Sequence, residues 1–271
     1  MDLGGRRARA RVSETGGWSM NTTVIVIAAV TGYLFGSISF ARVVARLFAP
    51  DIDPSKTKLD IKNSDEKFEV GVTSATTLSM QGVPKLGFLT AVLDMLKVAL
   101  PTLYFKNQFP GEYVFLVTAL AAMIGHVWPV WYRFRGGRGL TAVYGAMFTV
   151  DWVGTFVTFF GGMLLGIIVV RDILVAYLSG LWLLVIWLWF RTHDPAYVWY
   201  GLAANFIFLF SMIPEIKQYL DLKRRGFGAD IGETVQMTGM GRGIYRFARR
   251  LKLIRDSSPS PTGGGQGEGR Q

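Results

Sequence analysis

The sequence of 271 residues has no cysteine and only two histidines, His126 and His193. The lack of cysteine excludes disulfide bonds, thiolate metal sites and a cysteine nucleophile. The two histidines lie far apart in the chain and make a poor metal constellation. Acidic residues are the smaller charged group, with 19 Asp and Glu against 29 Lys and Arg and a net charge of +10. Disulfide-stabilised and thiol-dependent classes of protein are therefore ruled out.

Long polar stretches are scarce in this chain. Hydrophobic residues make up 51% of it and aromatic residues 14%, and the mean hydropathy is +0.33. An ordinary soluble domain is less apolar, and several runs approach the roughly 20 residues that a helix needs to cross a bilayer. Alternating segments of about 10 residues, which would indicate a membrane β-barrel, are lacking. The sequence predicts an all-α integral membrane protein whose basic loops face anionic lipid, which disfavours nucleic-acid binding.

The apolar stretches predict about seven transmembrane helices. They cover residues 21–48, 84–105, 112–132, 140–150, 152–170, 173–190 and 195–213, of which 140–150 is short enough to be a tilted or incomplete span. In the first span, Gly32, Gly36 and Ser37 leave room for another helix to approach closely. The basic residues after Pro214 place the C-terminus in the cytoplasm, and seven spans then place the N-terminus outside.

The remaining segments flank this membrane domain, which we expect over residues 21–222. Residues 1–20 are polar and are either a disordered tail or an extension that precedes a start at Met20. Residues 223–256 form a basic cytoplasmic segment, in which 244–254 alternate apolar and basic residues at the spacing of an interfacial helix. Residues 257–271 are rich in Ser, Pro and Gly, a composition typical of disorder.

The stretch at 125–139, G-H-V-W-P-V-W-Y-R-F-R-G-G-R-G, carries the clearest chemical signal. Its second half contains Arg133, Arg135, Gly136, Gly137, Arg138 and Gly139. Glycines permit positive φ angles and let the backbone approach a ligand closely. Successive N–H groups in such a turn form a concave anion site, and guanidinium groups match phosphate oxygens. The stretch therefore predicts a phosphate-binding turn at the cytoplasmic membrane surface.

Three ionisable side chains lie within the predicted spans. Asp94 and Lys97 are three residues apart on one helical face, and charges at membrane depth are so costly that they pair or face water. They are either a structural pair or part of a site in which Asp94 orients Lys97 toward an anionic ligand. His126 precedes Arg133 by about two helical turns, roughly 10 Å. It is either a site residue or a hydrogen-bond partner of a neighbouring helix.

Three motifs of this chain share their order and spacing with a known family. Residues 32–40, G-Y-L-F-G-S-I-S-F, resemble its first-helix signature, and residues 93–97, L-D-M-L-K, resemble its second-helix D-x-x-K. Residues 125–139 are similar to its G-H-x-F-P-V-x-x-x-F-x-G-G-K-G signature, with arginines where the family has mostly lysines. The family is that of the bacterial acyl-phosphate:glycerol-3-phosphate acyltransferases (PlsY), and the resemblance covers roughly residues 24–222.

The resemblance implies an enzyme that transfers a fatty acyl group from acyl phosphate to the 1-hydroxyl of glycerol 3-phosphate. The product is lysophosphatidic acid for phospholipid biosynthesis, made at the cytoplasmic face of the cell membrane, in contact with membrane lipid and with no cofactor or metal. Catalytic roles then fall to His126, Lys97 and Asp94. Substrate phosphate is expected at Gly71, Thr76, Arg133, Arg135, Gly136, Gly137, Arg138 and Gly139.

Two segments depart from the family pattern. The loop signature G-S-G-N-x-G-A-T-N corresponds here to residues 69–77, E-V-G-V-T-S-A-T-T, which keep Gly71 and Thr76 and either line the site or form plain loop. The last-span signature H-R-x-N-I-x-R corresponds to residues 211–217, S-M-I-P-E-I-K, whose Glu215 would repel a nearby phosphate. The alternatives are therefore a non-enzymatic relative that binds lipid phosphates and an enzyme with a changed acceptor.

Overall fold

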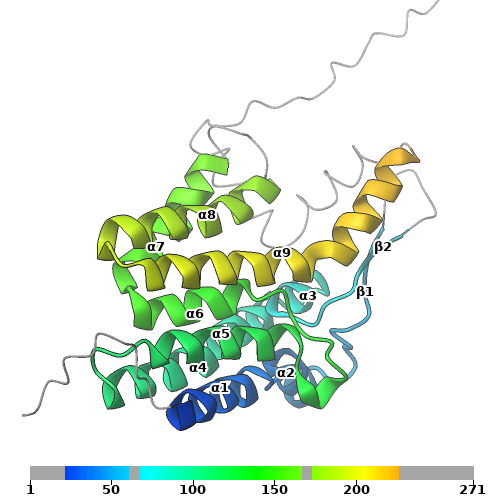
Figure 1. Ribbon diagram of the computed structural model, residues 1–271. Helices are drawn as coiled ribbons and strands as arrows, with labels where there is room; N and C mark the ends of the chain where they lie inside the picture. Colours follow the sequence, from blue (N-terminus) through cyan, green and yellow to red (C-terminus); the bar gives the residue numbers. More distant parts are fainter. Residues whose placement is uncertain (1–21, 61–66, 167–172, 226–271) are drawn as a thin grey trace, which may run out of the picture.

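The structure, a computed structural model, describes residues 22–60, 67–166 and 173–225 and is mostly helical (Figure 1). The elements are α1 (Thr22–Gly36), α2 (Phe40–Phe48), β1 (Thr57–Asp60), β2 (Lys67–Val70), α3 (Ala75–Met80), α4 (Pro84–Gln108), α5 (Val114–Val127), η1 (Val130–Tyr132), α6 (Leu140–Val150), α7 (Trp152–Leu164), α8 (Ile173–Thr192) and α9 (Pro195–Arg224). The predicted extension at 1–20, the predicted helix at 244–254 and the predicted tail at 257–271 lie outside the described residues.

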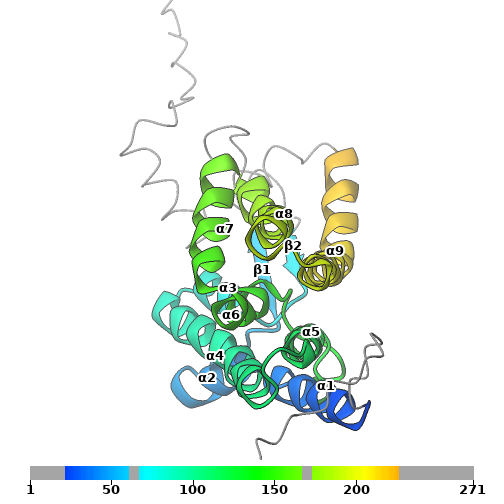
Figure 2. The ribbon, with the colours of Figure 1, turned by 60° about the vertical axis from the view of Figure 1, so that its left-hand side comes forward.

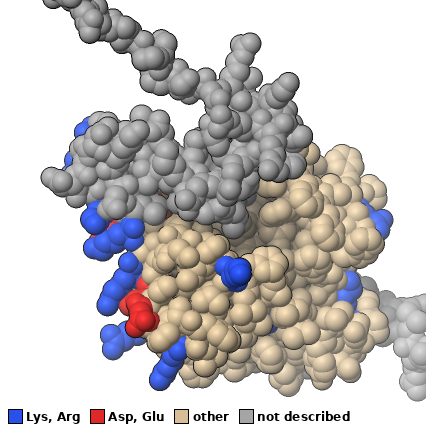
Figure 3. Space-filling model, turned by 180° about the vertical axis from the view of Figure 1, so that it is seen from behind, with Lys and Arg blue, Asp and Glu red and all other residues tan. Residues whose placement is uncertain are grey.

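Four helical segments in the described part are long and apolar enough to cross a membrane. They are Thr22–Phe48, Pro84–Gln108, Val114–Tyr132 and Pro195–Gln218, and shorter apolar helices cover Leu140–Val150, Trp152–Leu164 and Leu178–Thr192. Large side chains such as Phe88, Trp199 and Phe206 are at least 70% exposed, which suits contact with lipid tails. In Figure 3, several Lys and Arg side chains gather along one edge, and most of the remaining face carries no charge. The helical membrane class is confirmed, while the count of seven spans stays a prediction.

The first predicted span is interrupted. α1 ends at Gly36 and α2 begins at Phe40, so the span predicted over 21–48 consists of two helices with a break between them. A helix end leaves backbone N–H and C=O groups without partners in the helix itself. The break therefore supplies polar backbone groups inside an otherwise apolar segment, and one of them, the carbonyl of Ile38, accepts a hydrogen bond from a buried side chain described below.

Before the break, α1 packs closely against α5. A Cβ atom at Gly32 would collide with the backbone of Thr118, and one at Gly36 would collide with the backbone of Ala122. These contacts confirm the predicted close approach of a helix to the small residues of the first span. Because only glycine allows the two backbones to come so near, this packing fixes the end of α1 beside the end of α5.

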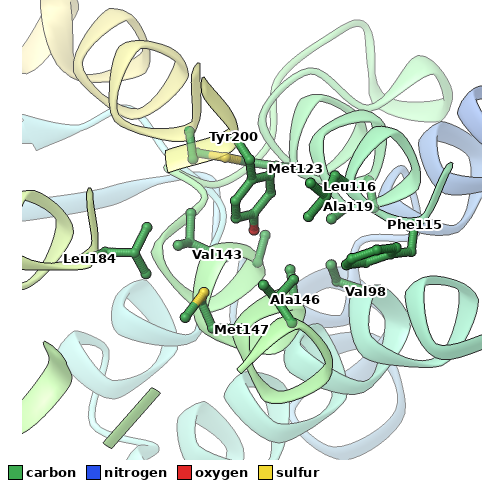
Figure 4. Close-up of a cluster of buried hydrophobic side chains, with 14 of the residues drawn as sticks. Val98, Phe115, Leu116, Ala119, Met123, Val143, Ala146, Met147, Leu184 and Tyr200 are labelled. Carbon is green, nitrogen blue, oxygen red and sulfur yellow. The ribbon is translucent and has the colours of Figure 1, made fainter. Parts of the chain in front are cut away.

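The main apolar core joins α5 to the helices on its other side. Met123 of α5, Val143 and Met147 of α6, Leu184 of α8 and Tyr200 of α9 are all buried together (Figure 4). Figures 1 and 2 show α5 between α1 and α9, which agrees with its contacts to both helices. α5 is therefore held from two sides, and the segment that follows it starts from a fixed position.

A sharp corner at Asp151 separates the short α6 from α7. The Asp151 carboxylate accepts a hydrogen bond from Val153 N–H at 3.1 Å, which caps the start of α7. Its other oxygen accepts a hydrogen bond from Trp187 Nε1 of α8 at 2.8 Å. One side chain thus ends the short span predicted at 140–150 and ties it to the next helices. The described part of the span predicted at 152–170 is helical to Leu164.

The segment between α2 and α4 is folded. It contains the hairpin β1–β2, in which Thr57 pairs with Val70, and α3, which Ser74 caps through a reciprocal pair of hydrogen bonds with Thr77. Figure 1 shows the hairpin beside the far end of α9. α9 itself bends but continues through Pro214 to Arg224, beyond the span predicted at 195–213.

Candidate functional site

A small pocket lies where four separate segments meet. The break between α1 and α2, the loop before α3, the middle of α4 and the end of α5 with its following turn all contribute to it. Its lining residues are Gly36, Ser37, Ile38, Ser39, Thr73, Asp94, Lys97, His126, Pro129 and Gly137. This set includes four of the residues predicted for the site, namely Asp94, Lys97, His126 and Gly137.

Lys97 is the buried cation of the pocket. Its Nζ lies 2.7 Å from Asp94 Oδ1, and the two side chains are 2% and 3% exposed. The same Nζ donates a hydrogen bond to the Ile38 carbonyl at 2.5 Å. An ammonium group has three N–H donors, so these two partners leave one for a ligand in the pocket. The predicted pairing of Asp94 with Lys97 is confirmed, and the helix break supplies the second partner that a buried charge needs.

His126 lies near the same oxygen of the Asp94 carboxylate as Lys97. Its Nδ1 is 3.8 Å from Asp94 Oδ1, which is too long for a hydrogen bond. Among the described residues Nδ1 has no hydrogen-bond partner, although the side chain is buried. Its Nε2 lies against Gly137, where a Cβ atom would collide with the imidazole ring. His126 is therefore placed by the glycine turn and keeps one nitrogen for a ligand.

The glycine turn is built differently from the predicted anion cradle. Gly136 N–H donates to Val127 O at 3.2 Å and Gly137 N–H to His126 O at 3.1 Å, so both serve the last carbonyls of α5. Positive φ angles are found at Arg133, Phe134 and Gly139, and not at Gly136 or Gly137. The prediction that Gly136 and Gly137 offer free N–H groups at positive φ is wrong. They are needed because α5 leaves no space for a Cβ atom at either position.

The three arginines of the turn do not converge. Arg133 and Arg135 are exposed, and neither lines the pocket. Arg138 is mostly buried, forms an ion pair with Glu215 of α9 and donates to the Ser211 carbonyl. Burial lowers the pKa of the Arg138 guanidinium to about 10, so it remains charged at neutral pH. The three side chains therefore do not form one phosphate cradle, although contact of any one of them with phosphate stays a prediction.

The two loop residues of the predicted site, Gly71 and Thr76, do not line the pocket. Gly71 lies near Glu215, whose Oε1 would be 3.6 Å from a Cβ atom at this position. Thr76 is half-buried in α3 and does not line the pocket. Thr73, which sequence reasoning did not single out, does line it, and its N–H donates to Gly136 O at 3.1 Å. This bond ties the loop to the glycine turn.

Sequence reasoning also missed the polar groups at the helix break. Ser37 and Ser39 line the pocket, and Arg42 Nη1 donates to Ser39 Oγ at 3.2 Å. Arg42 also stacks on the Tyr132 ring, 4.4 Å from its centroid, and donates to the carbonyl of Arg135 at 2.9 Å. The available signal was the run of small and polar residues in an apolar span, which we read as a packing surface.

Among the described residues no cluster of three potential metal ligands exists.

Comparison with known proteins gives one consistent family. The family model for glycerol-3-phosphate acyltransferase matches residues 26–221. The glycerol-3-phosphate acyltransferase of Pelagibacter ubique is 34% identical over 126 residues, which are 46% of this chain and 59% of that protein. The enzyme of the same name from Rhizobium etli is 31% identical over 133 residues, 49% of this chain and 58% of that protein. The chain thus spans less than two thirds of the length of these curated relatives.

Solved structures show the same fold. The crystal structure of PlsY (YgiH), an integral membrane glycerol 3-phosphate acyltransferase, in its lysophosphatidic acid form superposes with a TM-score of 0.60 and 24% identity, over 73% of this chain and 92% of that chain. Its glycerol 3-phosphate form gives a TM-score of 0.59 over the same shares. The arrangement of helices around the pocket is therefore one that occurs in an integral membrane protein.

Proposed function

This chain belongs to the glycerol-3-phosphate acyltransferase family, and we propose that it transfers a fatty acyl group from acyl phosphate to the 1-hydroxyl of glycerol 3-phosphate. The hydroxyl oxygen forms a bond to the acyl carbon, and the bond from that carbon to the phosphate oxygen breaks. Phosphate leaves and takes the hydroxyl proton, so the products are lysophosphatidic acid and inorganic phosphate. The step needs no cofactor, because a mixed anhydride already carries a good leaving group.

The observation that carries this proposal is the buried ammonium group of Lys97 with one N–H left for a ligand. Negative charge grows on the phosphate as it leaves, and a fixed cation in a pocket of low dielectric stabilises that charge. Asp94 holds Lys97 in place. The Ser39 hydroxyl also lines the pocket and adds a donor for a phosphate oxygen, whereas the Ser37 hydroxyl donates to the Tyr33 carbonyl at 2.8 Å.

His126 is the second residue that we assign to substrate. It lines the pocket, and its Nδ1 has no partner among the described residues. We place it at the acceptor hydroxyl, where a hydrogen bond orients the attacking oxygen. Gly137 supports this role because it is the residue against which the imidazole packs. Gly136 and Thr73 join the turn to the loop on the far side of the pocket.

We further propose a seven-span topology in the cell membrane, with the N-terminus outside, the C-terminus in the cytoplasm and the pocket facing the cytoplasm. The four long and three shorter apolar helices support the count. Exposed Lys217, Arg224 and Arg225 at the end of α9 support the orientation by the positive-inside rule. Residues 223–256 then continue as a basic segment on the inner membrane surface.

Turnover tests the proposed function directly. The full chain in lipid nanodiscs is supplied with palmitoyl phosphate and labelled glycerol 3-phosphate, and lysophosphatidic acid is measured. Asp94→Asn with Lys97→Gln removes the cation without leaving a buried unpaired carboxylate, and we expect a loss of about 100-fold or more in kcat. Lys85→Gln, at an exposed position of the same helix, is the matched control and keeps full activity.

Two results contradict this proposal. The first is a folded double variant that retains activity within a few-fold of the unaltered protein, since Lys97 would then have no catalytic role. The second is a complete lack of product from the unaltered protein. In that case labelled glycerol and other alcohols are tested as acceptors, because the Glu215 carboxylate beside Arg138 favours a changed acceptor as the second candidate function.

A further inference from the structure

The ion pair between Arg138 and Glu215 joins the glycine turn to α9. The side chains are 19% and 12% exposed, so the pair is largely removed from water. Ser211 lies one helical turn before Glu215 and makes two hydrogen bonds to Arg138. Its carbonyl accepts from the guanidinium, and its hydroxyl donates to the Arg138 carbonyl at 3.2 Å. Neither Glu215 oxygen has a further hydrogen-bond partner among the described residues. The carboxylate is therefore committed to Arg138.

Neither Arg138 nor Glu215 lines the pocket, but each lies next to a segment that contributes to it. Gly137, which precedes Arg138, lines the pocket. Gly71, which lies against Glu215, is two residues before the pocket residue Thr73, whose N–H donates to Gly136 O. The pair thus occupies the region where the turn, the loop and the last helix meet. A phosphate held at the Gly137 end of the pocket would therefore be near the Arg138–Glu215 pair.

The charges around the pocket are mostly cancelled in pairs. Lys97 is paired with Asp94, and Arg138 is paired with Glu215. Arg42 contacts a hydroxyl, a carbonyl and an aromatic ring, and it interacts electrostatically with the Asp53 carboxylate. A phosphate monoester near neutral pH carries between one and two negative charges, and a carboxylate within a few ångströms repels it. Without Glu215, the guanidinium of Arg138 would be free to bind phosphate bidentately.

We propose that Glu215 is a specificity-determining residue that neutralises Arg138 and lowers the affinity of the site for an acceptor phosphate. It thereby shifts preference from a doubly charged acceptor such as glycerol 3-phosphate toward an acceptor with less negative charge at that end, such as glycerol. The inference rests on the proposed function in taking the pocket as the place where the acceptor is acylated. The test measures phosphate binding as well as turnover, so that the inference about Glu215 and the proposed function can fail separately.

The binding experiment measures the affinity for inorganic phosphate by calorimetry on the full chain in nanodiscs. Glu215→Gln keeps the shape of the side chain and removes its charge, and we expect phosphate to bind roughly tenfold tighter. Arg138→Gln combined with Glu215→Gln loses that gain. Glu112→Gln removes one negative charge at an exposed position before α5, and it leaves the affinity unchanged. Glu215→Ser repeats the test with a smaller side chain, and thermal unfolding confirms that each variant is folded.

The turnover experiment compares two acceptors. In Glu215→Gln the KM for glycerol 3-phosphate falls by a similar factor, while the KM for glycerol stays the same. Equal or weaker phosphate binding in both folded variants overturns the inference, because Glu215 would then position Arg138 for phosphate. The inference is also overturned if Arg138→Gln combined with Glu215→Gln still binds phosphate tenfold tighter than the unaltered protein. If no variant turns over any acceptor, the proposed function fails, and the binding comparison still decides the role of Glu215.

Discussion

Gly137→Ala gives the sharpest test of how the pocket is built. The added Cβ would lie within contact distance of His126 Nε2, Cδ2 and Cε1. The imidazole is only 5% exposed, so the added methyl group would push it toward the pocket that it lines. Overpacking of this kind costs about 1–3 kcal/mol of stability. A displacement of the ring by about 1 Å costs on the order of 100-fold in rate when the ring orients the reacting group.

The neighbouring glycine predicts a different outcome for the same substitution. At Gly136 a Cβ would meet the backbone carbonyls of His126 and Val127 and the ring of Pro129. Backbone atoms cannot rotate away as a side chain can, so Gly136→Ala is expected to lose more stability than Gly137→Ala. Gly161→Ala in α7 is the matched control, because the nearest atom to its Cβ would be Leu183 Cδ1 at 3.5 Å, an ordinary contact.

The assays are thermal unfolding and acyl transfer in nanodiscs, run on all three variants. We expect Gly161→Ala to match the unaltered protein, Gly137→Ala to lose activity out of proportion to stability, and Gly136→Ala to lose chiefly stability. Full activity of Gly137→Ala would refute the reasoning, since it would show that the position of the imidazole does not matter. Equal stability of Gly136→Ala and Gly161→Ala would refute the close packing of the turn on α5.

Two further substitutions test the buried charges. Asp94→Asn alone leaves the Lys97 ammonium buried without an anionic partner, so we expect a loss of about 3–5 kcal/mol in the free energy of unfolding. This loss should exceed that of Asp94→Asn with Lys97→Gln, and equal losses in the two variants would contradict it. Asp151→Ala removes the cap of α7 and the acceptor of Trp187 Nε1. We expect the free energy of unfolding to fall by about 1–2 kcal/mol and kcat to stay unchanged. A change in kcat at unchanged stability would argue against a purely structural role.

Local pattern predicted those features that depend on one segment or on the total hydrophobicity of a segment. The apolar runs predicted the long helices, the spacing of Asp94 and Lys97 predicted their pairing, and the small residues of α1 predicted its close packing on α5. The break after Gly36 was missed because the three residues that follow, Ser-Ile-Ser, are compatible with a helix in an apolar segment. Only the tertiary partner of Ile38 makes the interruption favourable.

The glycine turn shows why the rest could not be predicted. Its composition fits an anion nest, but the N–H groups of Gly136 and Gly137 are used by the carbonyls at the end of α5. Whether such groups are free depends on how the preceding helix ends, which composition does not determine. Arg138 likewise finds its carboxylate on α9, far away in the chain. Counting basic residues in the turn therefore overestimated the positive charge available to a ligand.

One hydrogen bond in the pocket, from Lys97 to the Ile38 carbonyl, satisfies two buried polar groups. The break between α1 and α2 leaves the Ile38 carbonyl without a helical partner, and Lys97 buries an ammonium group that one carboxylate alone does not satisfy. Each group therefore stabilises the other, and the cation that we propose to bind the leaving phosphate is held by the same feature that interrupts the membrane helix. It follows that changes in α1 that restore a continuous helix, such as Ser39→Leu, should reduce activity through Lys97 even though they make the segment more apolar.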